Sequence, residues 1–115
     1  MRPEHLFNLL ADATRLRALM LIRSEGEVCV CELTYALEES QPKISRHLAL
    51  MRDAGLVTPR REGKWMHYSL ARNLPRWAAC VLEETAVQLA GDERFDRDRR
   101  RLESMNDRPG EKACA

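Results

Sequence analysis

The fold is decided in residues 40–57, which read SQPKISRHLALMRDAGLV. Ser40 can cap a helix by accepting a hydrogen bond from a free backbone N–H, and Pro42 suits the first turn, where a missing N–H costs nothing. Apolar residues then recur at helical spacing and predict one buried stripe, formed by Ile44, Leu48 and Met51. Gly55 suits the end of a helix. The stretch therefore predicts a helix that begins after Ser40 and ends near Ala54.

The face of this helix opposite the apolar stripe carries side chains that suit DNA. These are Gln41, Lys43, Ser45, Arg46 and His47. They lie mostly in the first two turns, which is the part of a recognition helix that enters the major groove. Glutamine and arginine can form paired hydrogen bonds with base edges, whereas serine and lysine suit phosphates. We therefore predict that this helix contacts DNA.

A β-hairpin is predicted over residues 56–70, where polar and apolar residues alternate around Glu62 and Gly63. Pro59 cannot donate a backbone hydrogen bond and therefore places the first strand at an edge of the sheet. The basic side chains of the hairpin, which can bind a DNA backbone or a minor groove, are Arg60, Arg61 and Lys64. With a preceding helix over residues 29–37 and a short polar turn, this order predicts a winged helix-turn-helix. A winged helix that binds protein instead of DNA is the alternative.

The remaining segments complete a fold that is mainly α-helical with one small β-hairpin. Further helices are expected at residues 6–10, 12–24 and 75–90. The last of these carries apolar residues on more than one face, and a chain this small has little core to cover them, which indicates a subunit interface. We expect residues 1–91 to form one DNA-binding and dimerisation domain. Residues 92–115 are expected to form a polar C-terminal tail that is mobile.

Charge is unevenly distributed along the chain, although its 115 residues carry a net charge of only +1. Residues 25–39 contain acidic side chains and no lysine or arginine, whereas basic side chains dominate residues 41–65. No stretch reaches the roughly 18 consecutive apolar residues of a membrane span. No signal peptide is visible, so we expect a cytoplasmic protein with no membrane partner.

Four cysteines are present, namely Cys29, Cys31, Cys80 and Cys114. Without a secretion signal a disulfide framework is not expected, so the close pair Cys29 and Cys31 indicates soft-metal binding or redox chemistry. On a continuous helix, residues two apart point in directions about 200° apart. We therefore expect the helix to hold these thiols apart, and a ligand that bridges them to unwind its first turn. Cys114 is a candidate third ligand, whereas Cys80 lies among apolar residues and is expected in the core.

Four segments carry a familiar combination of residues: LADATRLRALMLI (10–22), GEVCVCELTYAL (26–37), SQPKISRHLALMRDAGLV (40–57) and REGKWMHYSL (61–70). They resemble the ArsR/SmtB family, and more narrowly its arsenical resistance operon repressors. The resemblance implies a homodimer through the first and last helices, and a repressor that binds double-stranded operator DNA. It implies release by trivalent arsenic or antimony, bound by Cys29 and Cys31, with no organic cofactor. The related pattern has a third cysteine at the position of Thr34.

The same residues are compatible with alternative functions. Oxidation of the Cys29–Cys31 pair would make a thiol redox-sensing repressor, and a different soft metal would make another kind of metal sensor. A small thiol oxidoreductase is a further alternative, but the chain lacks a glycine-rich phosphate loop and a cysteine–histidine pair at a fixed spacing. We therefore predict a ligand-responsive DNA-binding protein that is not an enzyme.

Overall fold

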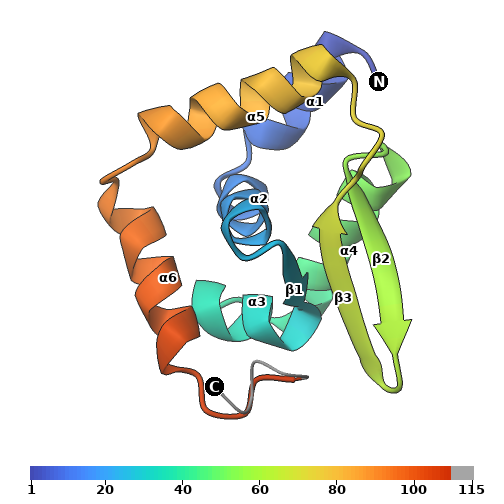
Figure 1. The fold of residues 1–115 in the computed structure, drawn as a ribbon. Coiled ribbons are helices and arrows are strands. Elements are labelled where there is room, and N and C mark those ends of the chain that lie inside the picture. Colours follow the sequence, from blue (N-terminus) through green and yellow to red (C-terminus); the bar gives the residue numbers. More distant parts are fainter. Residues whose placement is uncertain (110–115) are drawn as a thin grey trace.

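Six helices and a three-stranded antiparallel sheet at one side of the molecule form residues 1–109, the part of the chain that the computed structural model describes (Figure 1). The helices are α1 (Pro3–Leu10), α2 (Ala13–Glu25), α3 (Val30–Leu37), α4 (Gln41–Asp53), α5 (Arg76–Gln88) and α6 (Glu93–Ser104). The strands are β1 (Glu27–Cys29), β2 (Val57–Glu62) and β3 (Trp65–Leu70). Within these residues, no helix is long and apolar enough to cross a membrane. The order α3, α4, β2, β3 is that of a winged helix-turn-helix, as the sequence predicts.

Side-chain caps precede α2 and α4. Asp12 precedes α2, and its carboxylate accepts a hydrogen bond from the backbone N–H of Arg15 at 3.0 Å. Ser40 precedes α4, and its hydroxyl accepts a hydrogen bond from the N–H of Lys43 at 3.4 Å. The apolar stripe predicted for α4 is confirmed as buried, and consists of Ile44, Leu48 and Met51. The caps accept hydrogen bonds from backbone N–H groups that have no partner within the helix, so they define where each helix begins.

The hairpin forms as predicted and gains a third strand that the sequence analysis does not anticipate. The strand order is β1-β3-β2, so β3 is central and β2, with Pro59, lies at an edge. β1 pairs with β3 through Val28 opposite Tyr68 and Cys29 opposite His67. Val28 and Tyr68 are both buried in the core, which holds this short strand against β3. The chain is therefore extended, not helical, as far as Cys29.

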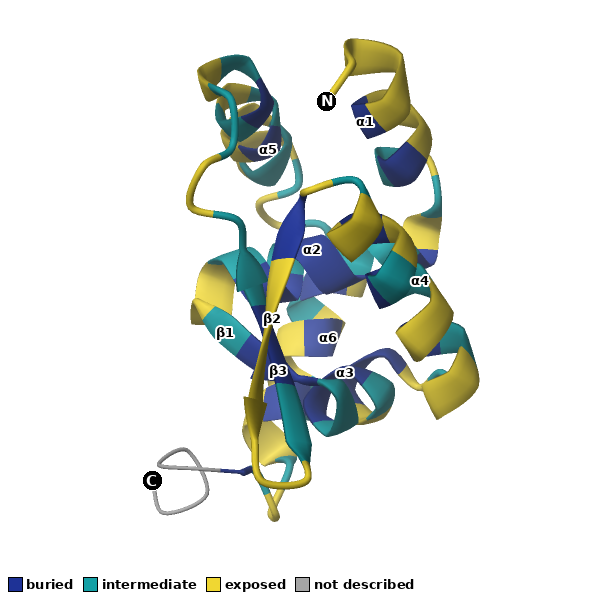
Figure 2. Cartoon of the chain, turned by 90° about the vertical axis from the view of Figure 1, so that its right-hand side faces the viewer, coloured by how far each residue is buried: buried dark blue, intermediate teal, exposed yellow. Residues whose placement is uncertain are grey.

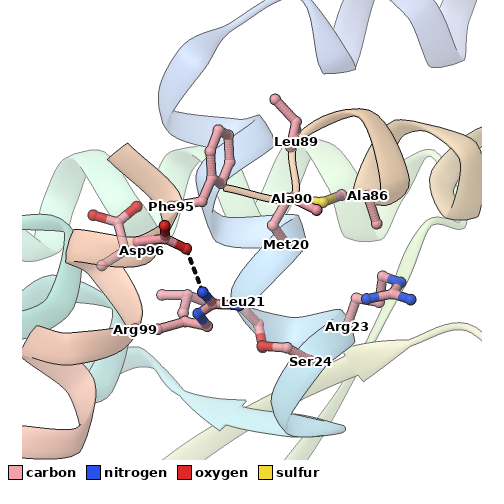
Figure 3. A pocket seen from close by; sticks show the side chains of 11 residues that line it. Met20, Leu21, Arg23, Ser24, Ala86, Leu89, Ala90, Phe95, Asp96 and Arg99 are labelled. Atoms are coloured by element: carbon pink, nitrogen blue, oxygen red, sulfur yellow. Dashed lines mark hydrogen bonds and ion pairs between the residues drawn. The ribbon is translucent and has the colours of Figure 1, made fainter. Parts of the chain in front are cut away.

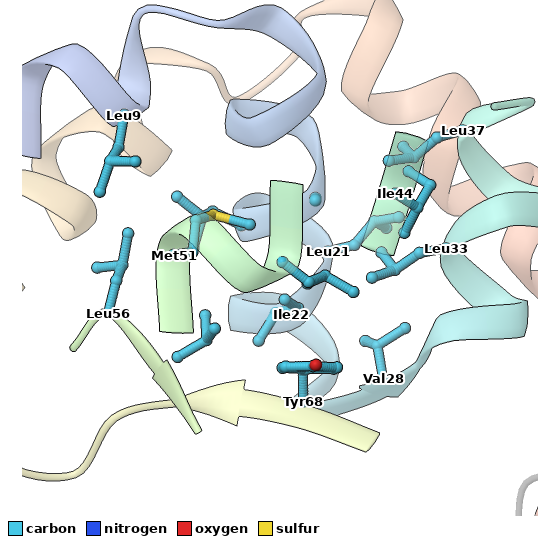
Figure 4. Close-up of a cluster of buried hydrophobic side chains, with 14 of the residues drawn as sticks. Leu9, Leu21, Ile22, Val28, Leu33, Leu37, Ile44, Met51, Leu56 and Tyr68 are labelled. Carbon is cyan, nitrogen blue, oxygen red and sulfur yellow. The ribbon is translucent and has the colours of Figure 1, made fainter. Parts of the chain in front are cut away.

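The hydrophobic core lies around α2, which is central in the molecule and contacts α3, α4 and the sheet (Figure 1). Figure 4 shows the buried cluster in which these elements meet. Its members include Leu21, Ile22, Val28, Leu33, Ile44, Met51 and Tyr68. The junction of β1 and α3 begins at the residue after Val28, a member of this cluster, so the junction is joined to α4 by the close packing of this core.

α1 and α5 lie at one end of the molecule, away from the tip of the hairpin (Figures 1 and 2). α5 buries Ala78 and Leu82, whereas Cys80, midway between them, is exposed. Residues two apart point to different sides of a helix, so burial of Ala78 and Leu82 leaves Cys80 outside. The expectation that Cys80 belongs to the core is therefore wrong.

The structure also differs from the polar tail expected after residue 91. A sixth helix, α6, packs against α2 and α3. Its buried face consists of Phe95, Asp98 and Leu102. These positions lie on one side of a helix, but the dense charge around them hides the pattern in the sequence. The helical body of the protein thus extends through Ser104.

A buried ion pair fastens α6 to the rest of the fold. Asp98 is 1% exposed and accepts hydrogen bonds from Nη2 and Nε of Arg17 at 2.7 and 2.8 Å. The same guanidinium donates to the backbone carbonyl of Leu37 at 3.3 Å. One side chain of α2 therefore joins α3 and α6, and the carboxylate of Asp98 depends on it for its charge balance.

Replacing Arg17 by methionine should lower the free energy of unfolding by about 3 kcal/mol, because the carboxylate of Asp98 would stay buried without a partner. The matched control is Arg23→Met. Arg23 also lies on α2 and pairs with a carboxylate, that of Glu83, at 2.7 and 3.0 Å, but this pair is exposed. Exposed pairs contribute about 0–1 kcal/mol. Urea denaturation followed by circular dichroism measures both losses, and equal losses would contradict the importance of burial.

Candidate thiol site beside a nucleic-acid interface

The two thiols lie at the junction between β1 and α3. Cys29 ends β1 with an extended backbone (φ −79°, ψ 152°) and immediately precedes the first helical residue, whereas Cys31 lies in the first turn of α3. Their sulfur atoms are 3.2 Å apart. The expectation that a helix holds the thiols apart is therefore wrong, because the chain changes from strand to helix between them. One atom can contact both sulfurs without unwinding the helix.

A buried carboxylate orders this junction. Glu32 is 1% exposed, and its Oε1 accepts a hydrogen bond from the backbone N–H of Cys29 at 2.8 Å. Its Oε2 accepts a hydrogen bond from Nε of Arg108 at 2.5 Å, and Arg108 also donates to Glu25 at 2.8 Å. Sequence reasoning missed both Glu32 and Arg108. A glutamate three residues after a helix cap is a recognisable pattern, but no local signal relates Glu32 to a residue 76 positions away.

The hydroxyl of Thr34, which takes the place of a third cysteine, donates a hydrogen bond to the backbone carbonyl of Cys31 at 2.8 Å. Across residues 1–109, the side chains of histidine, cysteine, aspartate and glutamate form no group of three that could hold a metal ion. Cys114, the candidate third ligand, lies outside the described residues. The site that the structure describes is therefore a pair of thiols.

Burial raises the pKa of the Cys31 thiol to about 12. The adjacent sulfur of Cys29 and the carboxylate of Glu32 add to this shift, because each disfavours negative charge on Cys31. Near neutral pH Cys31 is therefore a protonated thiol, and it donates to the sulfur of Cys29. A ligand can bond to this sulfur only if the thiol proton is removed at the same time.

A groove of about 320 Å³ opens beside the thiols and extends to both predicted DNA-binding elements. The junction contributes Cys29, Val30, Cys31 and Thr34, and the hairpin contributes Lys64, Trp65, Met66 and Tyr68. α4 contributes Gln41 and Ser45. Sequence reasoning did not place Trp65 or Met66 in the site, because their position beside the thiols depends on the pairing of β1 with β3. The thiol pair, the recognition helix and the hairpin therefore line one cavity.

The outer face of α4 presents Gln41, Ser45 and Arg46 as exposed side chains, which direct contact with DNA requires. Lys43 is half-buried, and its ammonium donates to both carboxylate oxygens of Glu39, at 2.9 and 3.0 Å. A DNA phosphate would have to compete with Glu39 for this charge. The predicted recognition face is thus available at three positions and engaged within the protein at Lys43.

His47 lies toward α2. Its Nδ1 is 3.3 Å from Nη1 of Arg15, and its Nε2 is 3.9 Å from a carboxylate oxygen of Asp12. Burial lowers the pKa of the His47 imidazole; the carboxylate of Asp12 opposes this effect, and the positive charge of Arg15 adds to it. The structure therefore shows His47 joining α4 to the start of α2, a packing contact that its sequence position did not reveal.

The hairpin carries Arg60, Arg61 and Lys64 at its exposed surface. Arg60 forms a bidentate pair with Glu27 of β1, at 2.7 and 2.9 Å. This pair spans the central strand, so it ties β2 to the strand that carries the first thiol. Nζ of Lys64 lies 5.0 Å from the centre of the Trp65 ring, within range of a cation–π interaction. Of the predicted basic residues, Arg60 is therefore linked to β1 and Lys64 to the wall of the groove.

A second cavity, of about 210 Å³, lies between α2, α5 and α6 (Figure 3). Its apolar wall includes Met20, Leu89 and Phe95, and its polar wall includes Arg99, which is paired with Asp96. Among the described residues that line it there is neither a cysteine nor a histidine. Soft-metal chemistry therefore points to the thiol groove and not to this cavity.

The sequence is similar to those of known bacterial regulators. Residues 12–58 match the family described as bacterial regulatory protein, arsR family. An arsenical resistance operon repressor from Escherichia coli K12 is 54% identical over 82 residues, which cover 71% of this chain and 70% of that protein. The arsenic resistance transcriptional regulator ArsR1 from Pseudomonas putida KT2440 is 49% identical over 114 residues, covering 98% and 88%. Both names describe gene regulation, which confirms the predicted class of regulator rather than enzyme.

A solved structure shares the architecture. HlyU from Vibrio cholerae N16961 superposes with a TM-score of 0.66 at 30% sequence identity, covering 75% of this chain and 89% of HlyU. The winged helix-turn-helix predicted from residues 29–70 is thus confirmed by the element order of this chain and by that likeness.

The raised pKa of Cys31 predicts an unusual pH dependence of its alkylation by iodoacetamide, because only the thiolate reacts. The rate at Cys31 should rise about tenfold per pH unit from about pH 7 to 10 without levelling off. The urea-unfolded protein is the control, in which the rate at Cys31 should level off near the ordinary thiol pKa of about 8.5. Peptide mapping by mass spectrometry measures the rate at Cys31 in the folded and in the unfolded protein. A plateau for Cys31 in the folded protein near the ordinary thiol value of about 8.5 would contradict the assigned environment.

Proposed function

Because this chain belongs to the ArsR family of bacterial regulatory proteins, we propose that it represses transcription until trivalent arsenic or antimony binds Cys29 and Cys31. One observation carries the proposal. The thiol pair lines the same groove as Gln41 and Ser45 of α4 and Lys64 of the hairpin. A ligand on the sulfurs therefore lies against the elements that contact double-stranded operator DNA.

The chemistry of the thiol pair supports trivalent arsenic as the ligand. Sulfur is a soft donor, and sulfurs 3.2 Å apart can both bond one atom. Arsenous acid carries hydroxyl groups, two of which can leave as water with the protons of two thiols, while arsenic stays trivalent. A protonated Cys31 is therefore no obstacle. A divalent cation such as zinc carries no hydroxyl group that could accept the thiol protons. Binding of zinc must therefore release these protons to solvent.

The DNA contacts that we propose lie on α4 and on the hairpin. Gln41, Ser45 and Arg46 are exposed and suit the major groove, and Arg61 and Lys64 suit the phosphate backbone. The predicted contacts Lys43, Arg60 and His47 are engaged within the free protein. Lys43 and Arg60 would exchange carboxylates for phosphates on binding, whereas His47 would keep α4 in place against α2.

We further propose that the repressor is a homodimer through α1 and α5. These helices lie at the same end of the molecule, opposite the hairpin tip (Figure 2). Phe7 of α1 is 54% exposed and Val87 of α5 is 68% exposed. Large apolar side chains exposed on two helices at the same end of a molecule are consistent with a subunit interface. This arrangement leaves α4 and the hairpin of each protomer free for one half-site of a symmetric operator.

A redox-sensing repressor is the second candidate function, because thiols 3.2 Å apart can form a disulfide after a small movement. Such a protein would release DNA on treatment with peroxide alone. Reduction with dithiothreitol would then restore binding.

The proposed function is tested by fluorescence anisotropy on a duplex from the region upstream of the protein's own gene. We expect arsenite or antimonite to weaken binding by about 5–150-fold, the usual range for coupled sites. Cys29→Ser and Cys31→Ser should bind DNA and no longer respond. Cys80→Ser, with its thiol exposed on α5, is the matched control and should respond fully. Arsenite-driven release that persists in Cys29→Ser would refute the assignment. Parallel titrations with zinc, cadmium and peroxide test the alternative functions of sensing another metal or an oxidant.

The dimer is tested by sedimentation velocity on Phe7→Asp and Val87→Asp. A buried carboxylate without a partner disfavours association, so both variants should shift toward monomer and bind DNA more weakly. Leu50→Asp, which alters an apolar side chain that is 51% exposed on α4, should leave the dimer intact. A dimer unaffected by the changes at Phe7 and Val87 would exclude this interface.

A further inference from the structure

The turn between α3 and α4 is held by arginines of α6. Glu38 begins this turn, and one of its carboxylate oxygens pairs with Arg97 and, at 3.6 Å, with Nε of Arg101. Nη2 and Nε of Arg101 also donate to the backbone carbonyl of Tyr35, at 2.9 and 3.2 Å. The same guanidinium lies 4.8 Å from the centre of the Tyr35 ring, within range of a cation–π interaction. Arg101 therefore joins α6 to the end of α3 through a backbone group, a ring and a carboxylate.

These contacts supply hydrogen bonds that α3 cannot make for itself. The last four carbonyl groups of a helix have no N–H partner within the helix. Arg101 donates to the carbonyl of Tyr35, and Arg17, which pairs with the buried Asp98 of α6, donates to that of Leu37. The end of α3 is therefore capped by side chains that belong to α2 and α6.

The backbone of Glu38 shows how closely the turn depends on α6. In the described part of the chain, Glu38 is the only residue other than glycine with a positive φ (φ 55°, ψ 45°). Helix ends in this left-handed conformation usually carry glycine, because a Cβ makes the conformation less favourable. Glycine, however, has no carboxylate that could pair with Arg97 and Arg101. The glutamate thus ties the turn to α6 in a backbone conformation that glycine would adopt more easily.

The turn in its place determines how α4 is presented. Residues 38–40 connect the two helices, and Ser40 caps α4. Gln41 and Ser45, which we propose as major-groove contacts, lie in the first turns of α4, directly after this connection. Hydrogen bonds to base edges depend on distance and angle, so a small displacement of the helix start weakens them. A residue that fixes the turn therefore affects the reading of bases without touching them.

We propose that Arg101 is a positioning residue for DNA recognition, which holds the turn between α3 and α4 so that α4 meets the major groove in one orientation. The inference rests on the DNA contacts of the proposed function. α6 packs against α2 and α3, on the side of the molecule opposite the hairpin (Figure 1). Arg101 therefore acts through the turn and not as a phosphate contact. Its loss should weaken sequence-specific binding and spare nonspecific binding, which comes from phosphate charge.

The inference is tested by fluorescence anisotropy on the full chain with two duplexes of equal length, one from the region upstream of the protein's own gene and one of shuffled sequence. Arg101→Met should raise the Kd for the upstream duplex about tenfold, or about 1.4 kcal/mol, and leave the Kd for the shuffled duplex unchanged. Arg101→Lys keeps the charge but lacks the planar fork that reaches the Tyr35 carbonyl from two nitrogens, so it should behave like Arg101→Met. Arg100→Met, which removes an exposed charge from the same helix, is the matched control and should keep the wild-type ratio of the two Kd values.

A second readout separates positioning from a general loss of stability. Amide hydrogen exchange in residues 37–43 should be faster in Arg101→Met, whereas exchange in the core of α2 should stay slow, because the change opens the turn and not the whole fold. Glu38→Gln, which removes the charge shared by Arg97 and Arg101, should lower the preference for the upstream duplex in the same direction.

Two results would overturn the inference and leave the proposed function standing. One is an unchanged ratio of the two Kd values in Arg101→Met and Glu38→Gln. The other is an equal loss of affinity for both duplexes, which would assign Arg101 to phosphate binding or to overall stability. If the wild-type protein binds the two duplexes equally, the proposed function fails, and the inference fails with it.

Discussion

The hydrogen bond from the backbone N–H of Cys29 to the buried carboxylate of Glu32 is the contact on which the geometry of the thiol pair depends. It holds Cys29 in an extended conformation while α3 begins at Val30. The carboxylate is buried, so it needs a second partner, and Arg108 supplies it from the segment after α6. Because the junction is held in this way, the sulfur of Cys31 lies against that of Cys29. The thiol pair is therefore formed by a strand end and a helix start.

The coupling that we propose between the thiol pair and the DNA contacts is local. The thiols, the polar side of α4 and one face of the hairpin line the same groove. The pair of Arg60 with Glu27 adds a second link, from β2 to the strand that ends at Cys29. Allosteric coupling requires that a ligand distinguish two arrangements of the protein. Here a bound ligand and a bound DNA would meet the same side chains, so no long relay of contacts is needed.

Local sequence patterns were sufficient to predict the recognition helix α4 and the β-hairpin. Ser40 caps α4 and Ile44, Leu48 and Met51 face the core, because capping and helical periodicity are properties of neighbouring residues. The strand β1 was not predicted, because it has only three residues and is stabilised by its pairing with β3. The packing of α6 was not predicted, because an aspartate in a charged segment is expected at the surface. Asp98 is buried because it pairs with Arg17, which is distant in sequence. Both depend on partners distant in sequence.

The sequence by itself determined the family and the winged helix-turn-helix, and it singled out the two thiols, since each rests on residue type at a short spacing. Only the tertiary structure decided how those thiols are placed. The pairing of β1 with β3 shortens α3 by one residue, so that Cys29 and Cys31 converge instead of facing apart. It also brings Trp65 and Met66 beside them. The physical reason is that a strand is stabilised by its partner strand, and that partner lies 38 residues away, at His67 opposite Cys29.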